Sequence, residues 1–395
     1  MDAAAALAFE RAYGARATRE ARAPGRANLI GEHVDYCGLA VLPMAIEQEV
    51  RIIFTPRGDA RVRIVNVDAG RFGAREFTLA LEVEYAQRGD WSNYVRAAAQ
   101  ELAARFELRR GIDACVYGDV PLAAGLSSSS AMVVASTLAL LEANDIRVPI
   151  AELMELCARA ERHVGTDSGG MDQAVSLGGR VGCALLVDFD PVRTRAIAIP
   201  DAWRFVIANS GVGAEKSGRA REAYNARVAE CREALRLTRA HPLATGWPGT
   251  WRQLVATLPE DELLAVGARA LDGDLARRFR HVITEGFRVE RAVLALERDD
   301  AAEFGRLMDL SHASLRDDHA VSCAELEACV AVAHQSGALG ARLTGAGFGG
   351  SIVALAYAKT ASAVESALRS SAGPSSAADA VFVARASGGA SVTRT

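Results

Sequence analysis

The chain has 395 residues, of which 50% are hydrophobic and 24% are charged. This balance is typical of folded globular proteins and excludes disorder along the whole chain. Its 45 basic and 49 acidic residues give a net charge of −4. A surface that binds nucleic acid or an anionic membrane needs a basic excess, so we expect neither partner.

The cysteines and lysines limit the chemistry further. The seven cysteines are an odd number and include no Cys-x-x-Cys pair, which favours a reduced cytoplasmic protein over a disulfide scaffold or a zinc site. Almost all basic residues are arginines, since Lys216 and Lys359 are the only lysines. The N-terminus has no basic segment, and no apolar run approaches the ~18 residues that span a bilayer, so we expect no signal peptide and no membrane segment.

Hydrophobic periodicity predicts the elements of the first half of the chain. They are a helix over 1–20, strands over 41–54 and 61–67, a helix over 92–106, a strand over 112–118, helices over 131–141 and 151–163, and a strand over 182–189.

In the second half the pattern shifts towards longer helices, which places a predicted domain boundary near residue 195 and divides the chain into 1–195 and 196–395. Strands and helices mix without strict βαβ alternation, which predicts an α+β fold rather than a doubly wound sheet. The predicted elements are a strand over 204–209, a helix over 215–239, a loop over 240–250, helices between 260 and 336, strands near 340–358 and a weak Ser/Ala/Gly/Pro loop over 369–378.

Four consecutive serines follow Gly125-Leu126 and precede an apolar helical run. The first amides of a helix have no internal partner and lie at the positive end of its dipole, so such a site binds phosphate. A plain helix N-cap is the alternative, because Ser is a favoured cap. Four serines favour phosphate binding, although the loop is not a Gly-x4-Gly-Lys-Ser/Thr loop, because it contains no lysine.

A second cluster, within Pro24–Tyr36, contains Arg26, Glu32, His33 and Asp35. Carboxylates and an imidazole at close spacing suit the hydroxyl groups of a sugar. A solvated loop is the alternative, and the spacing alone does not decide between them.

Two further carboxylates stand out. On the helix over 151–163, Glu161 shares a stripe with Met154 and Cys157, and a carboxylate on an apolar face is costly unless something pairs with it. The partner is either a metal ion or a buried arginine. Asp172 lies further along the chain in a glycine-rich turn where backbone can approach a substrate, although Asp is also common in turns for local reasons.

The segment Gly345–Gly350 matches the dinucleotide pattern Gly-x-Gly-x-x-Gly. The next seven residues, Ser351–Tyr357, have the pattern of a strand rather than a helix, so we exclude a Rossmann site. The glycines of the segment indicate either a close approach to a ligand or another loop, or a tight hairpin.

These clusters, in this order, resemble the galactokinase branch of the GHMP kinases. The Pro24–Tyr36 cluster resembles the sugar signature of that branch, the serine loop its ATP-phosphate motif, and the Gly345–Gly350 loop its third motif. The resemblance runs from about residue 9 to the C-terminus. Other similar segments are Trp91–Tyr94, Phe205–Ser210, Tyr224–Arg227 and Ser311–Asp318.

The resemblance implies a two-lobed α+β fold, with an N-terminal lobe like domain 2 of ribosomal protein S5 and a ferredoxin-like C-terminal lobe. Sugar and ATP would meet between the lobes. The implied reaction transfers the γ-phosphoryl group of ATP to the anomeric hydroxyl of D-galactose, with Mg²⁺ as cofactor. The implied protein is cytoplasmic and monomeric.

Matching positions assigns the site residues by resemblance. Asp172 matches the catalytic aspartate and Arg26 the arginine that pairs with it; whether Asp172 removes the proton or only orients the hydroxyl stays open. The implied sugar-binding residues are Glu32, His33, Asp35, Gly169 and Tyr224. The implied Mg²⁺ ligands are Ser129 and Glu161, with Ser128 as a neighbouring candidate. The implied ATP-binding residues are Trp91, Gly125, Leu126, Ser127, Ser128, Ser129 and Ser130.

The chain departs from the usual galactokinase pattern at Val34, Cys37 and Gly170, which look more like N-acetylgalactosamine kinases, whereas Tyr224 looks like a galactokinase. A kinase of N-acetylgalactosamine, galacturonate or arabinose is therefore an alternative. A galactose- and ATP-binding sensor without catalysis is a second one, against which the presence of Arg26, Glu161 and Asp172 argues.

Overall fold

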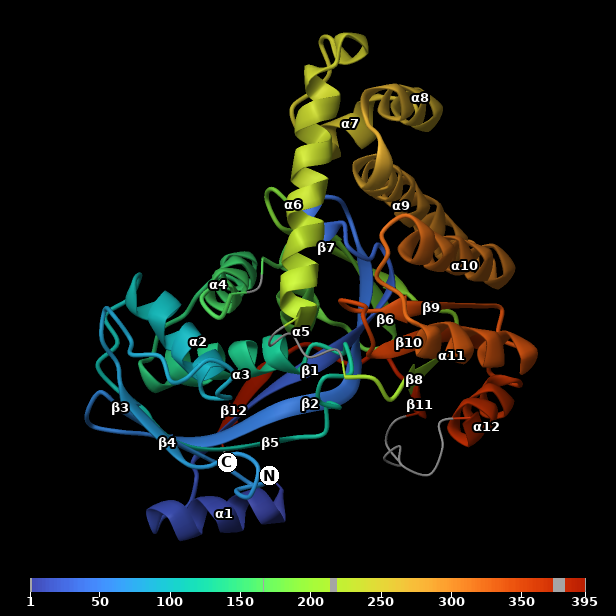
Figure 1. Cartoon of the computed structure of the whole chain (residues 1–395). Coiled ribbons are helices and arrows are strands. Elements are labelled where there is room, and N and C mark those ends of the chain that lie inside the picture. The colour runs from blue at the N-terminus through green and yellow to red at the C-terminus, as the bar shows by residue number, and fades with distance from the viewer. Residues whose placement is uncertain (1, 166, 214–218, 372–380, 395) are drawn as a thin grey trace.

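The computed structural model describes residues 2–165, 167–213, 219–371 and 381–394. Within them the chain forms two lobes, each built around a sheet of its own (Figure 1). Two parts of the sequence predictions lie outside the described residues, namely the start of the helix predicted at 215 and most of the loop predicted over 369–378. The α+β prediction is confirmed.

The first sheet has six strands in the order β12-β1-β2-β5-β3-β4. Neighbouring strands are antiparallel except for the parallel pair β3 and β5. Strand β12 brings the end of the chain back to the sheet that its beginning forms, and the domain boundary near residue 195 stays a prediction. The strands are β1 (Arg19–Ile30), β2 (Leu42–Pro56), β3 (Arg61–Asn66), β4 (Arg75–Thr78), β5 (Ile112–Gly118) and β12 (Ser391–Arg394).

Helix α3 is the central buried helix of this lobe. Twelve of its sixteen residues are buried, as expected of a helix that is apolar on every side. It packs with α5 against β1 and β2, while α2 and α4 cover it from outside and α1 lies on the opposite face of the sheet (Figure 1). The helices are α1 (Ala3–Tyr13), α2 (Asn93–Ala103), α3 (Ser128–Ala143), α4 (Ile150–Arg162) and α5 (Met171–Gly178).

The second sheet has four antiparallel strands in the order β11-β8-β10-β9. Side chains of β8 alternate between its faces: Phe205 packs against Phe304 of α10, whereas Val206 belongs to the core under α11 and α12. A separate hairpin of β6 and β7 packs against β2. These strands are β6 (Cys183–Asp188), β7 (Arg193–Ala198), β8 (Trp203–Asn209), β9 (Gly340–Thr344), β10 (Ser351–Tyr357) and β11 (Val381–Ala384).

Long helices complete the second lobe. Helix α6 packs along α9 and stands in Figure 1 between α4 on one side and α9 and α10 on the other. Short 3-10 helices lie at Asp35–Cys37 and Pro242–Ala244. In the described part of the chain, no helix combines the length and the apolar character needed to cross a bilayer. The remaining helices are α6 (Arg219–Ala240), α7 (Trp251–Thr257), α8 (Glu260–Ala270), α9 (Gly273–Glu297), α10 (Ala301–Asp317), α11 (Ala324–Gln335) and α12 (Ala361–Ser371).

The sequence predictions missed two elements that matter for the site. Strand β1 was not predicted, because Pro24 and Gly25 suggest a turn; the strand accommodates them with a shift of register between Pro24 and Arg26. Helix α5 was not predicted either, because the glycines before Asp172 indicate a turn, whereas Gly170, at φ 108°, is the N-cap of the helix. The strand predicted over 112–118 has its expected bounds.

Candidate active site

The serine loop ends in a strained cap and continues into α3. Ser127, the N-cap residue, has a left-handed backbone with φ of 63°, and its side chain makes no capping bond. Instead, its hydroxyl donates to Asp172 Oδ2 at 2.5 Å. Among its neighbours, Ser129 donates to Glu161 Oε1 at 3.0 Å and Ser130 to Glu161 Oε2 at 2.7 Å. Ser127 therefore holds the N-cap position without capping the helix with its hydroxyl, and three of the four serine hydroxyls point to buried carboxylates.

Asp172, in the first turn of α5, meets Arg26 of β1. Arg26 Nε donates to Asp172 Oδ1 at 2.8 Å, and Nη1 of the same side chain donates to the Gly125 carbonyl at 2.5 Å. Both side chains are almost fully buried. Burial by itself would lower the pKa of Arg26, but the carboxylates of Asp172 and Glu32 outweigh it and raise the pKa. Arg26 thus fixes the carboxylate against the backbone of the serine loop.

Glu161 lies on the predicted stripe of α4, and the stripe is buried as predicted, with Met154 and Cys157 beside it. Its side chain is 1% exposed. Besides the two serines it accepts a hydrogen bond from Gln173 Nε2, one residue after Asp172. Ser130 Oγ also lies 3.3 Å from Asp172 Oδ2. One small group of hydroxyls therefore links the two carboxylates.

The cluster of Glu32, His33 and Asp35 is buried, with exposed fractions of 2%, 3% and 8%. The solvated-loop interpretation is therefore wrong. The chain reaches this position at the end of β1, where it turns into the 3-10 helix Asp35–Cys37. Glu32 Oε2 accepts hydrogen bonds from Arg342 Nη2 and from the Gly345 amide, both at 3.0 Å, so the C-terminal lobe holds it.

His33 belongs to a network whose hydrogens can be assigned. Its Nε2 lies 3.0 Å from the Ala346 carbonyl oxygen, which can only accept, so Nε2 carries the proton. Its Nδ1 then accepts from the Tyr36 hydroxyl, 3.1 Å away, and that oxygen accepts from His319 Nε2 at 3.1 Å. Burial, reinforced by His281, lowers the pKa of His33 to about 3, so the ring stays neutral. A sugar hydroxyl that bonds this ring must displace one of these partners.

Asp35 meets Gly169 across the site. Its Oδ2 accepts a hydrogen bond from the Gly169 amide at 3.0 Å. A Cβ on Gly169 would lie 2.2 Å from the Asp35 carbonyl carbon, so only glycine allows this approach. Burial, with the nearby Asp172 carboxylate, raises the pKa of Asp35 to about 6. Tyr224 of α6 is buried, with its ring centroid 5.3 Å from that of His33.

Glu285 of α9, which sequence reasoning missed, fixes the backbone of the sugar signature. Its Oε1 accepts from the amides of Gly31 and Glu32 at 2.9 and 3.1 Å and from Ser311 Oγ at 2.7 Å, while Oε2 accepts from Arg288. Burial would raise its pKa, but Arg288 foremost reverses this and lowers the pKa to about 2. Glu285 lies more than 250 residues from the signature, so no local pattern could have indicated the contact.

The third glycine motif packs against the serine loop. A Cβ on Gly345, at φ 89°, would lie 2.5 Å from the Gly125 carbonyl oxygen. The motif connects β9 and β10, which form an antiparallel hairpin. Both interpretations of these glycines therefore hold, since the segment is a hairpin and also approaches another loop.

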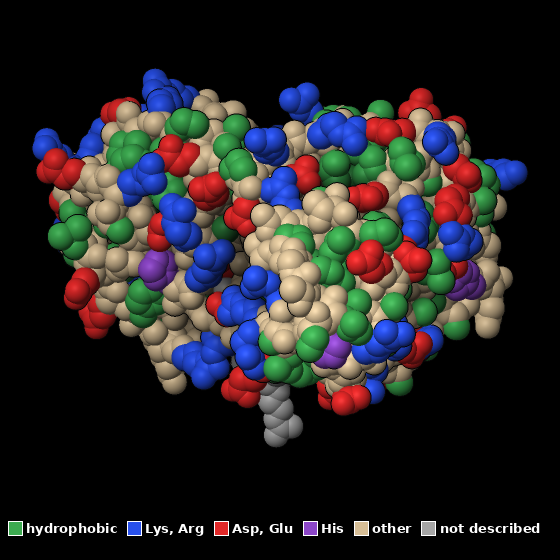
Figure 2. Space-filling model, turned by 90° about the horizontal axis from the view of Figure 1, so that it is seen from above, with side chains coloured by type: hydrophobic (Ala, Val, Ile, Leu, Met, Phe, Trp, Pro, Cys, Tyr) green, Lys and Arg blue, Asp and Glu red, His purple; other side chains and the backbone are tan. Residues whose placement is uncertain are grey.

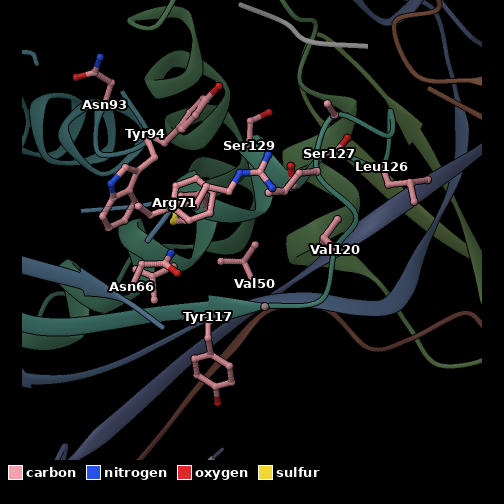
Figure 3. A pocket seen from close by; sticks show the side chains of 18 of the residues that line it. Val50, Asn66, Arg71, Asn93, Tyr94, Tyr117, Val120, Leu126, Ser127 and Ser129 are labelled. Carbon is pink, nitrogen blue, oxygen red and sulfur yellow. The ribbon is translucent and has the colours of Figure 1, made fainter. Parts of the chain in front are cut away.

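An open cavity of about 1260 Å³ lies on the other side of the serine loop. Gly125, Leu126, Ser127, Ser128 and Ser129 line it. Trp91 also lines it; its Nε1 donates to the Gly73 carbonyl at 3.2 Å and its ring meets Phe72 edge-on. Figure 3 shows side chains from β2, from the end of β3 and from the start of α2 around this space. The predicted ATP residues that border it therefore come together, while Ser130 lies behind them among the carboxylates.

Models of known families match three stretches of the chain: the galactokinase galactose-binding signature over residues 7–56, the N-terminal domain of GHMP kinases over 93–180 and the C-terminal domain of GHMP kinases over 292–374. A galactokinase of Chloroflexus aggregans is 40% identical over 356 residues, which are 89% of this chain and 87% of that protein. The chain belongs to the galactokinase family. A galactokinase of Roseiflexus sp. (strain RS-1) is 37% identical over 88% of this chain and 85% of that protein.

Solved structures agree with this family. The crystal structure of Lactococcus lactis galactokinase complexed with galactose matches at a TM-score of 0.88 and 30% identity, over 98% of each chain. Mevalonate kinase of L. major matches at a TM-score of 0.61 and 19% identity, over 93% of this chain and 96% of that one, which shows the shared fold alone. The predicted two-lobed GHMP kinase fold is confirmed. The roles of single residues in this galactokinase-family chain stay predictions.

Proposed function

We propose that this chain transfers the γ-phosphoryl group of ATP to the anomeric hydroxyl of D-galactose and releases galactose 1-phosphate and ADP. The observation that carries the proposal is the buried pair of Asp172 and Arg26, with 2.8 Å between Nε and Oδ1. The pair lies between the sugar signature and a serine loop that borders a large open cavity.

Asp172 is the group that handles the hydroxyl proton. A guanidinium in contact stabilises the ionised form of a carboxylate, and an ionised carboxylate can accept or orient the proton of the attacking hydroxyl. Phosphoryl transfer through a loose transition state needs positioning and charge stabilisation above all. Arg26 supplies part of both, because it fixes Asp172 and brings a positive charge to the serine loop.

Glu161 and Ser129 would hold the magnesium ion. Their oxygens lie 3.0 Å apart, and Mg²⁺ prefers carboxylate and hydroxyl oxygens together with water and phosphate. Ser128, next to them at the cavity wall, is the neighbouring candidate. When bound, the ion neutralises charge on the nucleotide phosphates.

The sugar hydroxyls would meet Asp35, Glu32, His33, Tyr224 and the Gly169 amide. Asp35 is suited to accept hydrogen bonds from two hydroxyls, since each carboxylate oxygen has two lone pairs. The nucleotide would lie in the cavity, with its adenine near Trp91 and its phosphates at Gly125, Leu126 and Ser127–Ser130. The amides at the start of α3 and the dipole of that helix favour the phosphate charge.

A kinase of a galactose derivative is the second candidate. Gly170 borders a second cavity of about 410 Å³, which Asp35 and Gly169 also line. A Cβ on Gly170 would point to Ala158 at 3.2 Å and Phe189 at 3.9 Å, so a larger residue there would extend into this region. This space next to Asp35 favours a substrate with an additional substituent, such as the acetamido group of N-acetylgalactosamine.

A panel of sugars assayed for ATP-dependent phosphorylation tests the proposal. We expect kcat/KM for galactose to exceed the values for N-acetylgalactosamine, galacturonate and arabinose. A higher value for N-acetylgalactosamine would establish the second candidate instead. Binding of galactose and ATP without galactose-dependent release of ADP would indicate a sensor rather than an enzyme.

We also propose that the protein is a cytoplasmic monomer. All seven cysteines are unpaired thiols, as expected in a reducing compartment. Acidic and basic side chains both occur on each half of the face shown in Figure 2, and the net charge of −4 gives no reason to expect a nucleic-acid partner.

A further inference from the structure

Four arginines line the large cavity, and the guanidinium groups of three of them contact a carboxylate or a carbonyl group of the protein. Arg51 forms ion pairs with Glu49 and Glu20. Arg88 lies 4.0 Å from Glu222. Arg221 donates to the Val164 carbonyl at 2.9 Å.

The fourth, Arg71, differs from the others. Among the residues that the structure describes, no carboxylate and no hydrogen-bond acceptor pairs with its guanidinium. Its side chain contacts the ring of Phe72, with the guanidinium carbon 5.3 Å from the ring centroid. The described part of the chain thus leaves all five of its N–H donors available to a ligand.

The backbone around Arg71 holds the side chain at the cavity. Its amide donates to both the carbonyl and a carboxylate oxygen of Asp68 at 3.2 Å, which closes a turn after β3. The next residue, Phe72, packs edge-on against Trp91 with 6.1 Å between ring centroids. Figure 3 shows the Arg71 side chain extending into the cavity, towards the side from which Ser127 and Ser129 enter it.

Apart from these four arginines and His163, no basic side chain among the described residues lines the cavity. The serines are neutral, and Arg26 is already paired with Asp172. Lys359 lies in the C-terminal lobe against the ring of Tyr357, and Lys216 lies outside the described residues. Carboxylates, among them Asp68 and Asp119, also line the cavity. A bound nucleoside triphosphate therefore meets acidic side chains and needs a positive group, and a guanidinium suits phosphate oxygens because its N–H groups bond two of them at once.

We infer that Arg71 is a nucleotide-binding residue that contacts the α- and β-phosphates, the two that stay on the nucleotide after transfer. This role presupposes the nucleotide site proposed above. The γ-phosphate has to reach Asp172, which is 6% exposed and enclosed by Ser127 and Ser130. Arg71 is exposed at the open side of the cavity, so it meets the phosphates nearer to the adenosine.

The test is the affinity of adenosine, AMP and ADP for the full chain and for Arg71→Gln, measured by calorimetry. Arg109→Gln is the matched control, because it removes the same charge from a side chain that is 76% exposed, pairs with Glu107 and lies outside the cavity. We expect Arg71→Gln to weaken ADP binding about tenfold, in the range of a charge-assisted hydrogen bond at an exposed site. Adenosine binding stays unchanged, and the control binds all three ligands like the unmodified chain.

Two further readouts separate charge from packing. Arg71→Lys keeps the charge and recovers part of the ADP affinity. In turnover, Arg71→Gln raises KM for ATP while kcat stays within about twofold, as when binding is lost equally from the ground and transition states.

Three results would overturn the inference. Unchanged ADP affinity in Arg71→Gln, or an equal loss in Arg109→Gln, would show that this guanidinium does not meet the phosphates. An equal loss for adenosine would show that Arg71 acts through its packing on Phe72. If the unmodified chain bound neither AMP nor ADP, the proposed function would fail and the inference with it, an outcome that is distinct because it needs no variant.

Discussion

The proposed site has two halves, one assigned to the sugar and one to the nucleotide, and they are built in opposite ways. In the sugar half, Arg26, Glu32, His33, Asp35 and Asp172 are all at most 8% exposed and bonded to other protein groups. In the nucleotide half, an open cavity of about 1260 Å³ is lined by hydroxyls, aromatic rings and an arginine with no acidic partner among the described residues. The sugar half is thus preorganised, a condition for stabilising charge in a transition state, whereas the nucleotide half keeps donors available for a charged ligand.

The halves also differ in which lobe supplies them. Arg342, Gly345, Ala346 and Glu285 of the C-terminal part hold the sugar signature. The cavity wall comes almost entirely from residues before Ala143, with His163, Val164, Arg221 and Ala346 as additions. We therefore expect damage to the C-terminal contacts to affect sugar binding and stability more than nucleotide binding.

The largest effect is expected from Asp172→Asn. Loss of the carboxylate should lower kcat by on the order of 10² or more, since general acid–base help is typically 10²–10⁴, with a modest change in ADP affinity. Steady-state kinetics and calorimetry measure the two quantities. Asp261→Asn on the exposed face of α8 is a matched control, and near-full turnover in Asp172→Asn would contradict the assigned role.

The next largest effect is expected from Glu285, which connects α9 to the sugar signature. Glu285→Ala removes the acceptor of the Gly31 and Glu32 amides and leaves Arg288 buried without its partner. We expect a loss of about 3–5 kcal/mol in the free energy of unfolding, as when a buried ion pair loses one member. Urea titration measures it, and KM for galactose should rise more than KM for ATP.

Glu303→Ala is the control for that variant, because Glu303 pairs with Arg306 at the surface of α10. Its loss should lower the free energy of unfolding by at most about 1 kcal/mol. Equal losses in the two variants would mean that Glu285 has no special part in holding the signature.

A smaller effect is expected from Glu161→Gln. The amide keeps the size of the side chain but removes the charge that would hold Mg²⁺, so the magnesium concentration for half-maximal activity should rise on the order of tenfold. Titration of MgCl₂ at fixed ATP measures this. An unchanged magnesium dependence would support a purely structural carboxylate that orders the serine hydroxyls.

The smallest effect is a pH dependence of sugar binding. The pKa of Asp35 is raised to about 6 by burial first and then by Asp172. The neutral form therefore stabilises the fold at low pH, and this contribution is lost as pH rises through about 6. If the carboxylate accepts hydrogen bonds from sugar hydroxyls, galactose affinity should improve as the pH rises towards the pKa of Asp35. Below that pKa the affinity should change roughly tenfold for each pH unit.

Asp35→Asn provides the matching control, since it has no charge to gain in this range. Its galactose affinity should be weak and flat between pH 5 and 7. A flat profile in the unmodified chain would show that Asp35 does not bind the sugar as a carboxylate.

Sequence reasoning named groups that the structure brings together, but it did not show how they are held. The stripe of Glu161, the serine loop and the order of the motifs are local signals, and they predicted the fold family correctly. Whether the sugar cluster is buried was left open, because spacing does not report burial. Glu285 and Arg342 lie more than 250 residues from the groups they bind, so only the packed lobes reveal them. Strand β1 was missed because Pro24 and Gly25 favour a turn locally, and pairing with β2 overrides that preference.

The product of the reaction tests the central claim most directly. The protein is incubated with galactose, ATP and MgCl₂, and phosphorus NMR tracks where the transferred phosphate goes. We predict a sugar phosphate whose phosphorus couples to the anomeric proton, formed in equal amount to ADP. No product, or phosphate on any other hydroxyl, would contradict a site in which Asp172 and Arg26 prepare the anomeric oxygen for transfer.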